Sequence, residues 1–338
     1  MRELLKTEHL SVSFFTKSGE VEAVRDVSLT VEEGEVLAIV GESGCGKSAL
    51  CKSIMKLLPK TAKIKSGKIL ADGIDITDYT ERNMSRLRGE LFSMIFQDPM
   101  TSLNPTMTIG KQIGEAVRIH NKKMPKKQVK KKVLELMQLV EIDEPEVRIS
   151  QYPYEFSGGM HQRAVMAIAL AGNPKILFAD EPTTALDVTI QAQILDVFRR
   201  IQKKLGMATV FISHDLGVVA GVADRVAVMY AGKIVEIGTA EEIFYDPRHP
   251  YTWGLLQSLP ILSRGKEWLP TLPGMPPTLI HPPKGDAFAE RNAYAMRIDY
   301  EKEPPMFQVT DTHYAATWLL DERAPEVKAP IGERRYGK

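Results

Sequence analysis

Short, mostly apolar runs recur along the first 250 positions of the chain, and each is followed by a glycine, a polar residue or a turn. They occupy residues 36–40, 175–179, 209–213 and 226–230. Continuous apolar runs of this length are typical of buried strands in a parallel sheet. Between about residues 100 and 172 the apolar positions recur at helical spacing instead, at Val129, Val133, Leu136, Met137 and Val140. The pattern predicts an α/β core with a mainly helical segment inside it.

The last quarter of the chain has a different composition. Residues 256–338 contain 11 of the 21 prolines, and all three tryptophans lie beyond residue 250. Proline-rich stretches favour short elements joined by loops. We therefore predict two domains, a core over residues 1–255 and a small Pro-rich C-terminal domain over residues 256–338.

Composition excludes several classes of protein. The 338 residues carry a formal net charge of +1, with 43% hydrophobic and 26% charged residues, which are ordinary globular values. Bulk charge therefore gives no reason to expect nucleic acid as a partner. The two cysteines, Cys45 and Cys51, are too few for a disulfide framework or a four-thiolate zinc site. No apolar signal core opens the chain and no stretch of about 20 apolar residues occurs, so we expect any work at a membrane to need a membrane-spanning partner.

A phosphate-binding loop follows the first apolar run. Residues 41–48 read Gly-Glu-Ser-Gly-Cys-Gly-Lys-Ser, which matches G-x-x-x-x-G-K-[ST] between a strand and a predicted helix. Such glycines let successive backbone N–H groups point at phosphate oxygens, while the lysine reaches the β- and γ-phosphates and the serine hydroxyl binds Mg²⁺. We expect Cys45 only to fill the loop. The candidate nucleotide-binding residues here are Gly41, Ser43, Gly44, Cys45, Gly46, Lys47, Ser48 and Ala49.

Two adjacent carboxylates end the apolar run at 175–179. Side chains alternate along a strand, so Asp180 and Glu181 cannot share one role. We expect Asp180 to hold Mg²⁺ through water, and Glu181 to accept a proton from the water that attacks the γ-phosphate.

A second anion-binding helix start precedes this strand. Ser157, Gly158 and Gly159 open a predicted helix, and one nucleotide needs only one phosphate loop. The presence of a second anion-binding segment suggests that these residues bind ATP held by a different subunit.

Together these segments resemble the nucleotide-binding subunits of ATP-binding cassette (ABC) transporters. Residues 156–160, Phe-Ser-Gly-Gly-Met, stand where that family has its LSGGQ-type signature. The resemblance implies a P-loop NTPase fold with a RecA-like core and a helical subdomain at about residues 98–172. Met160 replaces the signature's glutamine, and we expect Gln162 to replace its polar contact in part.

The resemblance also implies roles for isolated residues. Gln97 corresponds to the residue that touches Mg²⁺ and the attacking water, and Asp187 to a loop that crosses the dimer interface. His214 corresponds to the histidine that contacts the γ-phosphate. Phe14, on the first strand, is the candidate that stacks on adenine, with Phe15 as its neighbour.

Segments 96–105, 185–193 and 246–252 narrow the resemblance to the ATPases of oligopeptide and dipeptide permeases, and the tail after residue 255 is similar to their C-terminal extension. This implies an ATPase at the cytoplasmic face of the membrane that uses ATP and Mg²⁺ to energise peptide import. The implied partners are a paralogous ATPase subunit, two integral-membrane permease subunits and, indirectly, an extracellular peptide-binding protein. A homodimer, a different small solute such as nickel, and hydrolysis at one or both ATP sites remain open.

The C-terminal region departs from many such relatives, which carry four cysteines for an iron–sulfur cluster. Asp286, Asn292 and Asp299 stand at three of those positions, and Thr317 is placed at the fourth. Without thiolates we expect no cluster; a hard-cation site on the two aspartates is the alternative. We expect aromatic packing to stabilise this domain instead, through Phe288, Tyr294, Phe307 and Trp318.

Three other classes of protein are alternatives to a transport ATPase. A soluble ABC ATPase, a P-loop kinase and a regulatory module that holds ATP without turnover would all share the phosphate loop.

The lysines between residues 122 and 132 predict the solvated face of a helix, with contact to anionic lipid headgroups as the alternative.

Overall fold

A computed structural model describes residues 2–184, 186–259 and 272–330 of the chain. The residues divide into two compact units. Unit 1 comprises residues 1–5, 31–36 and 78–212, and unit 2 comprises residues 6–30, 37–77 and 213–338.

Unit 1 is built around three neighbouring parallel strands. They are β6 (Phe92–Ile95), β7 (Ile176–Asp180) and β8 (Ala208–Ser213), with Ile95 opposite Ala179 and Asp180 opposite Ile212. Every residue of β7 and β8 is buried, as their continuous apolar pattern predicts. Because the strands are parallel, the residues that follow β6 and β7 lie at one edge of this sheet.

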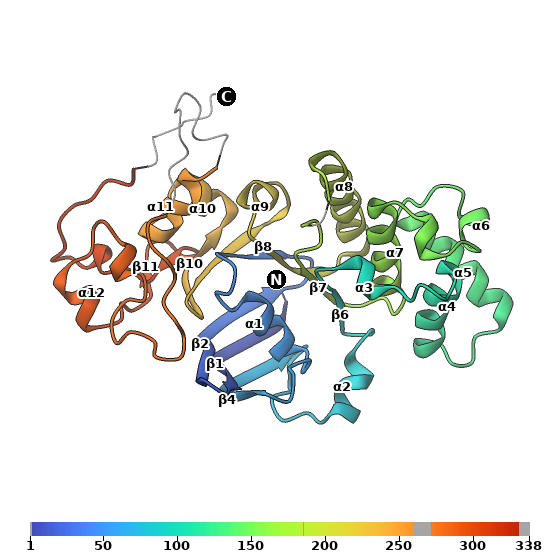
Figure 1. Cartoon of the computed structure of the whole chain (residues 1–338), viewed down its shortest axis with the longest axis horizontal. Helices are drawn as coiled ribbons and strands as arrows, with labels where there is room; N and C mark the ends of the chain where they lie inside the picture. Colours follow the sequence, from blue (N-terminus) through green and yellow to red (C-terminus); the bar gives the residue numbers. More distant parts are fainter. Residues whose placement is uncertain (1, 185, 260–271, 331–338) are drawn as a thin grey trace. The chain divides into compact units, whose positions relative to one another are not determined.

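The predicted helical segment is confirmed. Figure 1 shows its helices gathered in green around α7 (Gly158–Leu170), and α4 (Ile109–His120) packs against both α5 (Lys126–Leu139) and α7. The apolar residues of α5 that predicted a helix are all buried, and the most exposed of them, Leu136, has only 3% of its surface open to solvent. The helices of unit 1 are α2 (Glu81–Leu87), α3 (Pro99–Ser102), α4 (Ile109–His120), α5 (Lys126–Leu139), α6 (Pro145–Arg148), η1 (Pro153–Glu155), α7 (Gly158–Leu170) and α8 (Val188–Leu205).

Unit 2 contains two sheets. One has the strand order β2-β1-β4-β5, with the bounds β1 (Glu3–Thr16), β2 (Gly19–Glu32), β4 (Ala62–Ala71) and β5 (Ile74–Asp75). In the other, β3 (Val36–Val40) runs parallel to β9 (Arg225–Tyr230), and β10 (Lys233–Thr239) pairs antiparallel with β9. The strand predicted at residues 226–230 is β9. The turn that follows it has positive φ at Ala231 and Gly232.

The C-terminal region extends this second sheet. Strand β12 (Tyr314–Ala315) pairs with β10, and β11 (Phe307–Gln308) pairs with β12. The domain boundary predicted at residue 255 falls within α11 (Pro250–Gln257) and stays a prediction. The remaining helices of unit 2 are α1 (Lys47–Ile54), α9 (Leu216–Val222), α10 (Ala240–Tyr245), α11 (Pro250–Gln257), η2 (Ala289–Arg291), α12 (Arg297–Glu301) and η3 (Trp318–Leu320).

Each of the four rings expected to pack in the C-terminal region makes an aromatic contact in the structure. Phe288 packs edge-on against Tyr230 at 5.3 Å, Tyr294 against Trp253 at 5.5 Å, and Phe307 against Trp318 at 6.1 Å. The rings of Phe288 and Tyr294 therefore dock onto β9 and α11, where edge-to-face contacts add to the burial of apolar area.

Candidate nucleotide-binding and hydrolysis residues

The phosphate loop lies in unit 2, between β3 and α1, and its glycines are required by geometry. Gly41, Gly44 and Gly46 all have positive φ, at 149°, 80° and 109°. A Cβ on Gly41 would lie 2.1 Å from the carbonyl oxygen of Met229, and one on Gly46 would lie 2.2 Å from that of Ala23. The backbone is therefore curled too tightly for any other residue at these two positions. This cradle, with a lysine and a serine at its end, suits a magnesium-bound triphosphate.

The side chain of Lys47 is folded over the loop. Its Nζ donates hydrogen bonds to the carbonyl oxygens of Gly41 at 2.8 Å and Glu42 at 2.9 Å. Cys45 is buried beside it, and burial raises the pKa of the Cys45 thiol despite the nearby Lys47 ammonium. A buried thiol with a raised pKa is a poor nucleophile, and the role of Cys45 as a loop filler stays a prediction.

The hydrolysis candidates of unit 1 meet at the carboxyl ends of β6 and β7. Asp180 is the buried last residue of β7, and Glu181 follows it with φ at 47°. Gln97, two residues beyond β6, donates from Nε2 to Glu181 Oε2 at 3.2 Å, and Thr184 Oγ1 donates to the same oxygen at 3.0 Å. The two carboxylates thus differ in surroundings, as the alternation along a strand predicts. Sequence reasoning missed Thr184, which has only its position three residues after Glu181 as a signal.

The signature segment starts α7 in unit 1. Ser157 is its N-cap, and its hydroxyl accepts a hydrogen bond from the N–H of Met160 at 3.4 Å. A Cβ on Gly159 would lie 2.8 Å from the side chain of Ile190, and one on Gly158 would lie 3.3 Å from Leu186. Ile190 belongs to α8, whose exposed N-cap is Asp187. The glycines therefore let the start of α7 pack against the start of α8, which places the signature beside the Asp187 loop.

The expectation for Gln162 is wrong. Its side chain is fully buried in α7, at 0% exposure, while Met160 is half-buried. Two residues along a helix point to different faces, so Gln162 cannot replace a contact that position 160 would make. Both amide atoms of Gln162 lack a hydrogen-bond partner within the described parts of the chain.

Two further candidates lie in unit 2. His214 is exposed and directly follows β8, one residue before the N-cap of α9. Phe14 is half-buried on β1, whereas its neighbour Phe15 is exposed and has the Lys63 and Lys65 amines 5.8 Å and 5.4 Å from its ring. Two lysine amines thus lie over the Phe15 ring, and the assignment of Phe14 to adenine stays a prediction.

Local hydrogen bonds involve all four side chains for which the sequence suggested a substitution of cysteine. Asp286 accepts from the N–H of Phe288, Asn292 from that of Tyr294, and Thr317 from that of Leu319, each two residues further along the chain. Asp299 accepts from the N–H of Met296 at 2.6 Å. Each side chain thus stabilises the turn in which it sits. Among the residues that the structure describes, no group of three or more His, Cys, Asp or Glu is placed to hold a metal ion.

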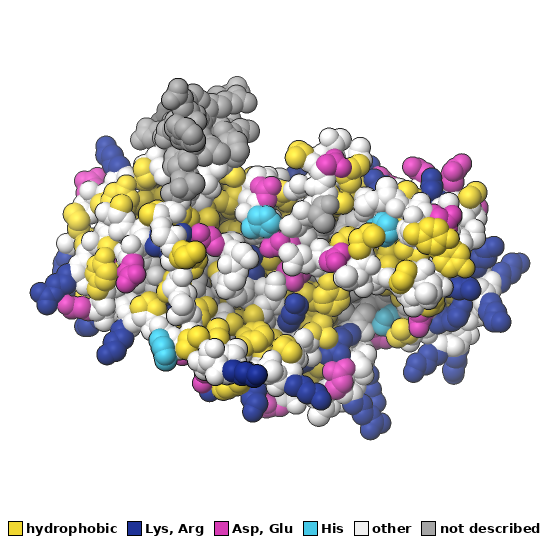
Figure 2. Space-filling model, in the orientation of Figure 1, with side chains coloured by type: hydrophobic (Ala, Val, Ile, Leu, Met, Phe, Trp, Pro, Cys, Tyr) yellow, Lys and Arg dark blue, Asp and Glu magenta, His cyan; other side chains and the backbone are white. Residues whose placement is uncertain are grey.

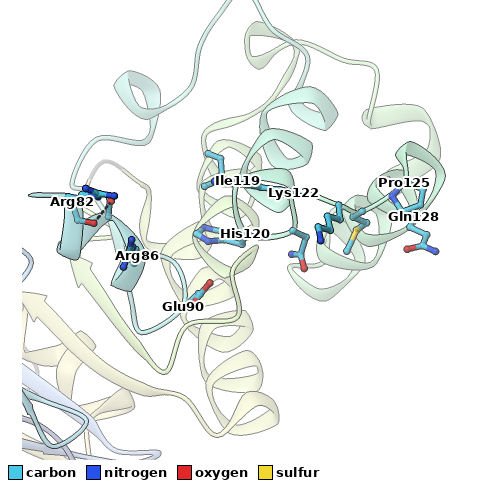
Figure 3. A pocket seen from close by; sticks show the side chains of 12 residues that line it. Arg82, Arg86, Glu90, Ile119, His120, Lys122, Pro125 and Gln128 are labelled. Atoms are coloured by element: carbon cyan, nitrogen blue, oxygen red, sulfur yellow. Dashed lines mark hydrogen bonds between the residues drawn. The ribbon is translucent and has the colours of Figure 1, made fainter.

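A basic hollow of about 1060 Å³ lies in unit 1 (Figure 3), and neither Glu181 nor Gln97 is among the residues that line it. Its lining includes Arg82, Arg86 and Glu90 near α2, and His120 and Lys122 at the end of α4. Gly89 allows the His120 ring to approach, since a Cβ there would lie 2.0 Å from it. The lysines of α5 itself are exposed, as predicted for a solvated helix face, and Figure 2 shows basic side chains gathered over this part.

Comparison with known families assigns both parts of the chain. Residues 24–184 match the family model described as ABC transporter, and residues 235–298 match that described as oligopeptide/dipeptide transporter, C-terminal region. None of the helices among the described residues has the length and apolar character needed to cross a membrane.

Similar proteins include two bacterial subunits. The oligopeptide transport ATP-binding protein OppD of Bacillus subtilis is 59% identical over 97% of this chain and 92% of its own length. The dipeptide transport ATP-binding protein DppD of Lactococcus lactis is 57% identical over 96% of this chain and 93% of its own length.

Solved structures agree with the fold. The dimeric, post-hydrolysis ATP-binding cassette MJ0796 bound to ADP and Pi has a TM-score of 0.63 at 26% identity, covering 70% of this chain and 99% of that one. The cassette cbiO1 of Clostridium perfringens, part of an ABC transporter complex, has a TM-score of 0.64 at 28% identity, covering 73% and 92%. The chain therefore belongs to the ABC transporter family, among the ATP-binding proteins of oligopeptide and dipeptide transport.

Proposed function

We propose that this transport ATPase energises the import of oligopeptides or dipeptides, and that the chain by itself supplies only part of each ATP site that it serves. The peptide assignment is supported by the names of its close relatives and by the matched C-terminal region. Nickel and other small solutes are the alternative cargo.

The phosphate loop supplies the binding half. In this proposal Lys47 binds the β- and γ-phosphates and the loop N–H groups bind the remaining phosphate oxygens. Ser43, Gly44 and Ala49 shape or contact the same cradle, and Phe14 stacks on adenine. The 2.8 Å and 2.9 Å bonds that Lys47 makes to loop carbonyls keep its ammonium over the cradle.

The carboxylates and Gln97 supply the hydrolytic half. When Mg²⁺ is bound, it neutralises phosphate charge, and Ser48, Asp180 and Gln97 are the residues that would hold it. Glu181 accepts a proton from the attacking water, and the bonds from Gln97 and Thr184 orient its carboxylate for that step. His214 contacts the γ-phosphate.

The observation that carries the two-subunit proposal is the exposed surface around Ser157. Ser157 and Gly158 are exposed, and so are Asp187 and Val188, with 82% of Val188 open to solvent. An anion-binding helix start packed beside a second exposed helix start suits ATP that a companion subunit presents. The dimeric, ADP-bound cassette of similar fold supports the same arrangement.

We assign the companion as a paralogous ATPase subunit. Two integral-membrane permease subunits complete the transporter, and the helical region over about residues 98–172 binds them. An extracellular peptide-binding protein delivers the peptide. The chain thus works peripherally at the cytoplasmic face of the membrane. No nucleic acid takes part.

Reconstitution of the transporter tests this function. The chain is co-expressed with the permease and ATPase subunits encoded beside it, purified, and placed in vesicles with a peptide-loaded binding protein. We expect the chain to co-purify with the membrane subunits, and ATP turnover to rise when peptide is supplied. Turnover that responds to nickel and not to peptide would overturn the cargo, and failure to associate with any membrane subunit would favour a soluble ATPase.

A further inference from the structure

One arginine of the C-terminal region forms a salt bridge with the phosphate loop. Arg291, at the end of η2, donates from Nη1 to Glu42 Oε2 at 2.6 Å and from Nη2 to Glu42 Oε1 at 2.9 Å. Glu42 is the second residue of the phosphate loop, 249 positions earlier in the chain. Only 4% of the Arg291 side chain and 27% of that of Glu42 are exposed, so water screens this two-bond pair only weakly.

The guanidinium of Arg291 is held on its other sides as well. Its Nε donates to the carbonyl oxygen of Pro273 at 2.7 Å, and Nη1 also reaches the Tyr230 hydroxyl at 3.2 Å. The rings of Tyr230 and Phe288 lie 5.6 Å and 5.8 Å from the guanidinium carbon. A planar fork fixed in this way presents its donors to Glu42 in one orientation.

Glu42 is held by its main chain too. Its N–H donates to the hydroxyl of Tyr251 on α11 at 2.8 Å, while its carbonyl oxygen accepts from Lys47 Nζ at 2.9 Å and from the N–H of Cys45 at 3.3 Å. The residue that Arg291 fixes therefore accepts hydrogen bonds from both Cys45 and Lys47 of the same loop.

We propose that Arg291 is a positioning residue for the phosphate loop, through which the C-terminal region raises the affinity of the chain for ATP. It neutralises the Glu42 carboxylate, which would otherwise repel a triphosphate, and it fixes the loop before nucleotide arrives. A loop ordered in advance loses less conformational entropy on binding. This role rests on the proposal that residues 41–48 bind the ATP phosphates.

A double-mutant cycle tests the role. ATP affinity is measured on the purified full chain by displacement of a fluorescent ATP analogue, for wild type, Arg291→Met, Glu42→Gln and the double variant. We expect Arg291→Met to raise the Kd for MgATP about 10-fold, because it leaves Glu42 charged and unpaired. Glu42→Gln alone should raise it about threefold or less, and adding Glu42→Gln to Arg291→Met should recover part of the affinity.

That recovery separates positioning from mere stability. If Arg291 only held the C-terminal region together, neutralising Glu42 would not restore ATP binding, so equal affinities for Arg291→Met and the double variant overturn the proposal. Arg297→Met is the matched control: its side chain is 93% exposed and pairs with Glu301 in the same region, and its Kd should equal that of wild type.

Two more variants complete the design. Arg291→Lys keeps the charge but loses the fork, and should raise the Kd about threefold even if Arg291→Met does not fold; wild-type affinity in Arg291→Lys overturns the proposal. Lys47→Ala distinguishes the two levels of the account. ATP binding that survives Lys47→Ala overturns the phosphate-loop assignment and the role of Arg291 with it. Binding that Lys47→Ala abolishes but Arg291→Met and Arg291→Lys leave unchanged overturns only the role of Arg291.

Discussion

Gln97 donates a hydrogen bond from Nε2 to Oε2 of Glu181, across 3.2 Å and 84 positions of sequence. The register of β6 and β7 brings the two side chains together, because Ile95 lies opposite Ala179, and Gln97 and Glu181 each come two residues after one of these paired residues. The contact joins a residue proposed to touch Mg²⁺ and water with the residue proposed to take the proton.

Glu181→Gln should bind ATP and hydrolyse it slowly. The amide cannot accept the proton of the attacking water, and we expect turnover to fall by roughly 10²–10³-fold, about 3–4 kcal/mol of activation free energy. The measurement is the ATPase rate of the assembled transporter together with the Kd for ATP. Glu241→Gln, on the exposed first turn of α10, is the control and should behave as wild type. Near-normal turnover in Glu181→Gln would show that this carboxylate is not the base.

Gln162→Met should stabilise the chain. The buried Gln162 amide makes no hydrogen bond within the described residues, and a buried unsatisfied amide costs about 1–3 kcal/mol. Methionine has a similar volume and no such cost, so the free energy of unfolding in urea should rise by about 1 kcal/mol or more. Gln138→Met, at an exposed position of α5, should change it little. A loss of stability in Gln162→Met would mean that the amide has a partner such as buried water.

Asp286→Asn should stabilise the chain increasingly as pH rises. Burial raises the pKa of Asp286 to about 6, opposed by the bond from the Phe288 N–H and helped by the Asp299 and Glu303 carboxylates. Because the folded state holds this proton more tightly than the unfolded chain, wild type loses stability as pH rises from about 4 to about 6. The asparagine keeps an acceptor for Phe288 and never ionises.

Unfolding experiments between pH 4 and pH 8 measure this effect. The variant should match wild type near pH 4 and exceed it by up to about 3 kcal/mol above pH 6. Asp321→Asn should have the opposite effect. Hydrogen bonds from Arg323 lower the pKa of Asp321 to about 2, so replacing this carboxylate should lower the stability of the chain at neutral pH. A difference between Asp286→Asn and wild type that does not vary with pH would rule out a raised Asp286 pKa.

The elements of the fold were predictable where a single local pattern determines them. The apolar runs that became β3, β7, β8 and β9 have no polar alternation, and Lys47 marks the start of α1 because the loop motif fixes strand, turn and helix together. The spacing of Val129 and Val133 placed the buried face of α5 in the same way.

Contacts between distant segments were not predictable. Nothing near Arg291 in the sequence indicates Glu42, because the pairing depends on how the C-terminal region folds over β9 and α11. Gln162 was misjudged for a related reason: sequence proximity to Met160 suggested a shared role, whereas the helix turns the two side chains to different faces.

The dependence of ATP turnover on Ser157 and on a companion subunit tests the central claim most directly. The purified chain is assayed alone at increasing dilution and with its companion ATPase subunit, as wild type, as Ser157→Arg and as Ser150→Arg, the last placing an arginine at another exposed serine of unit 1. The account predicts that the dilute chain alone binds ATP with little turnover and that the companion restores turnover. Ser157→Arg, unlike Ser150→Arg, should then lower turnover in the pair without changing the affinity of the isolated chain for ATP. Full turnover by a dilute monomer, unaffected by Ser157→Arg, would contradict it.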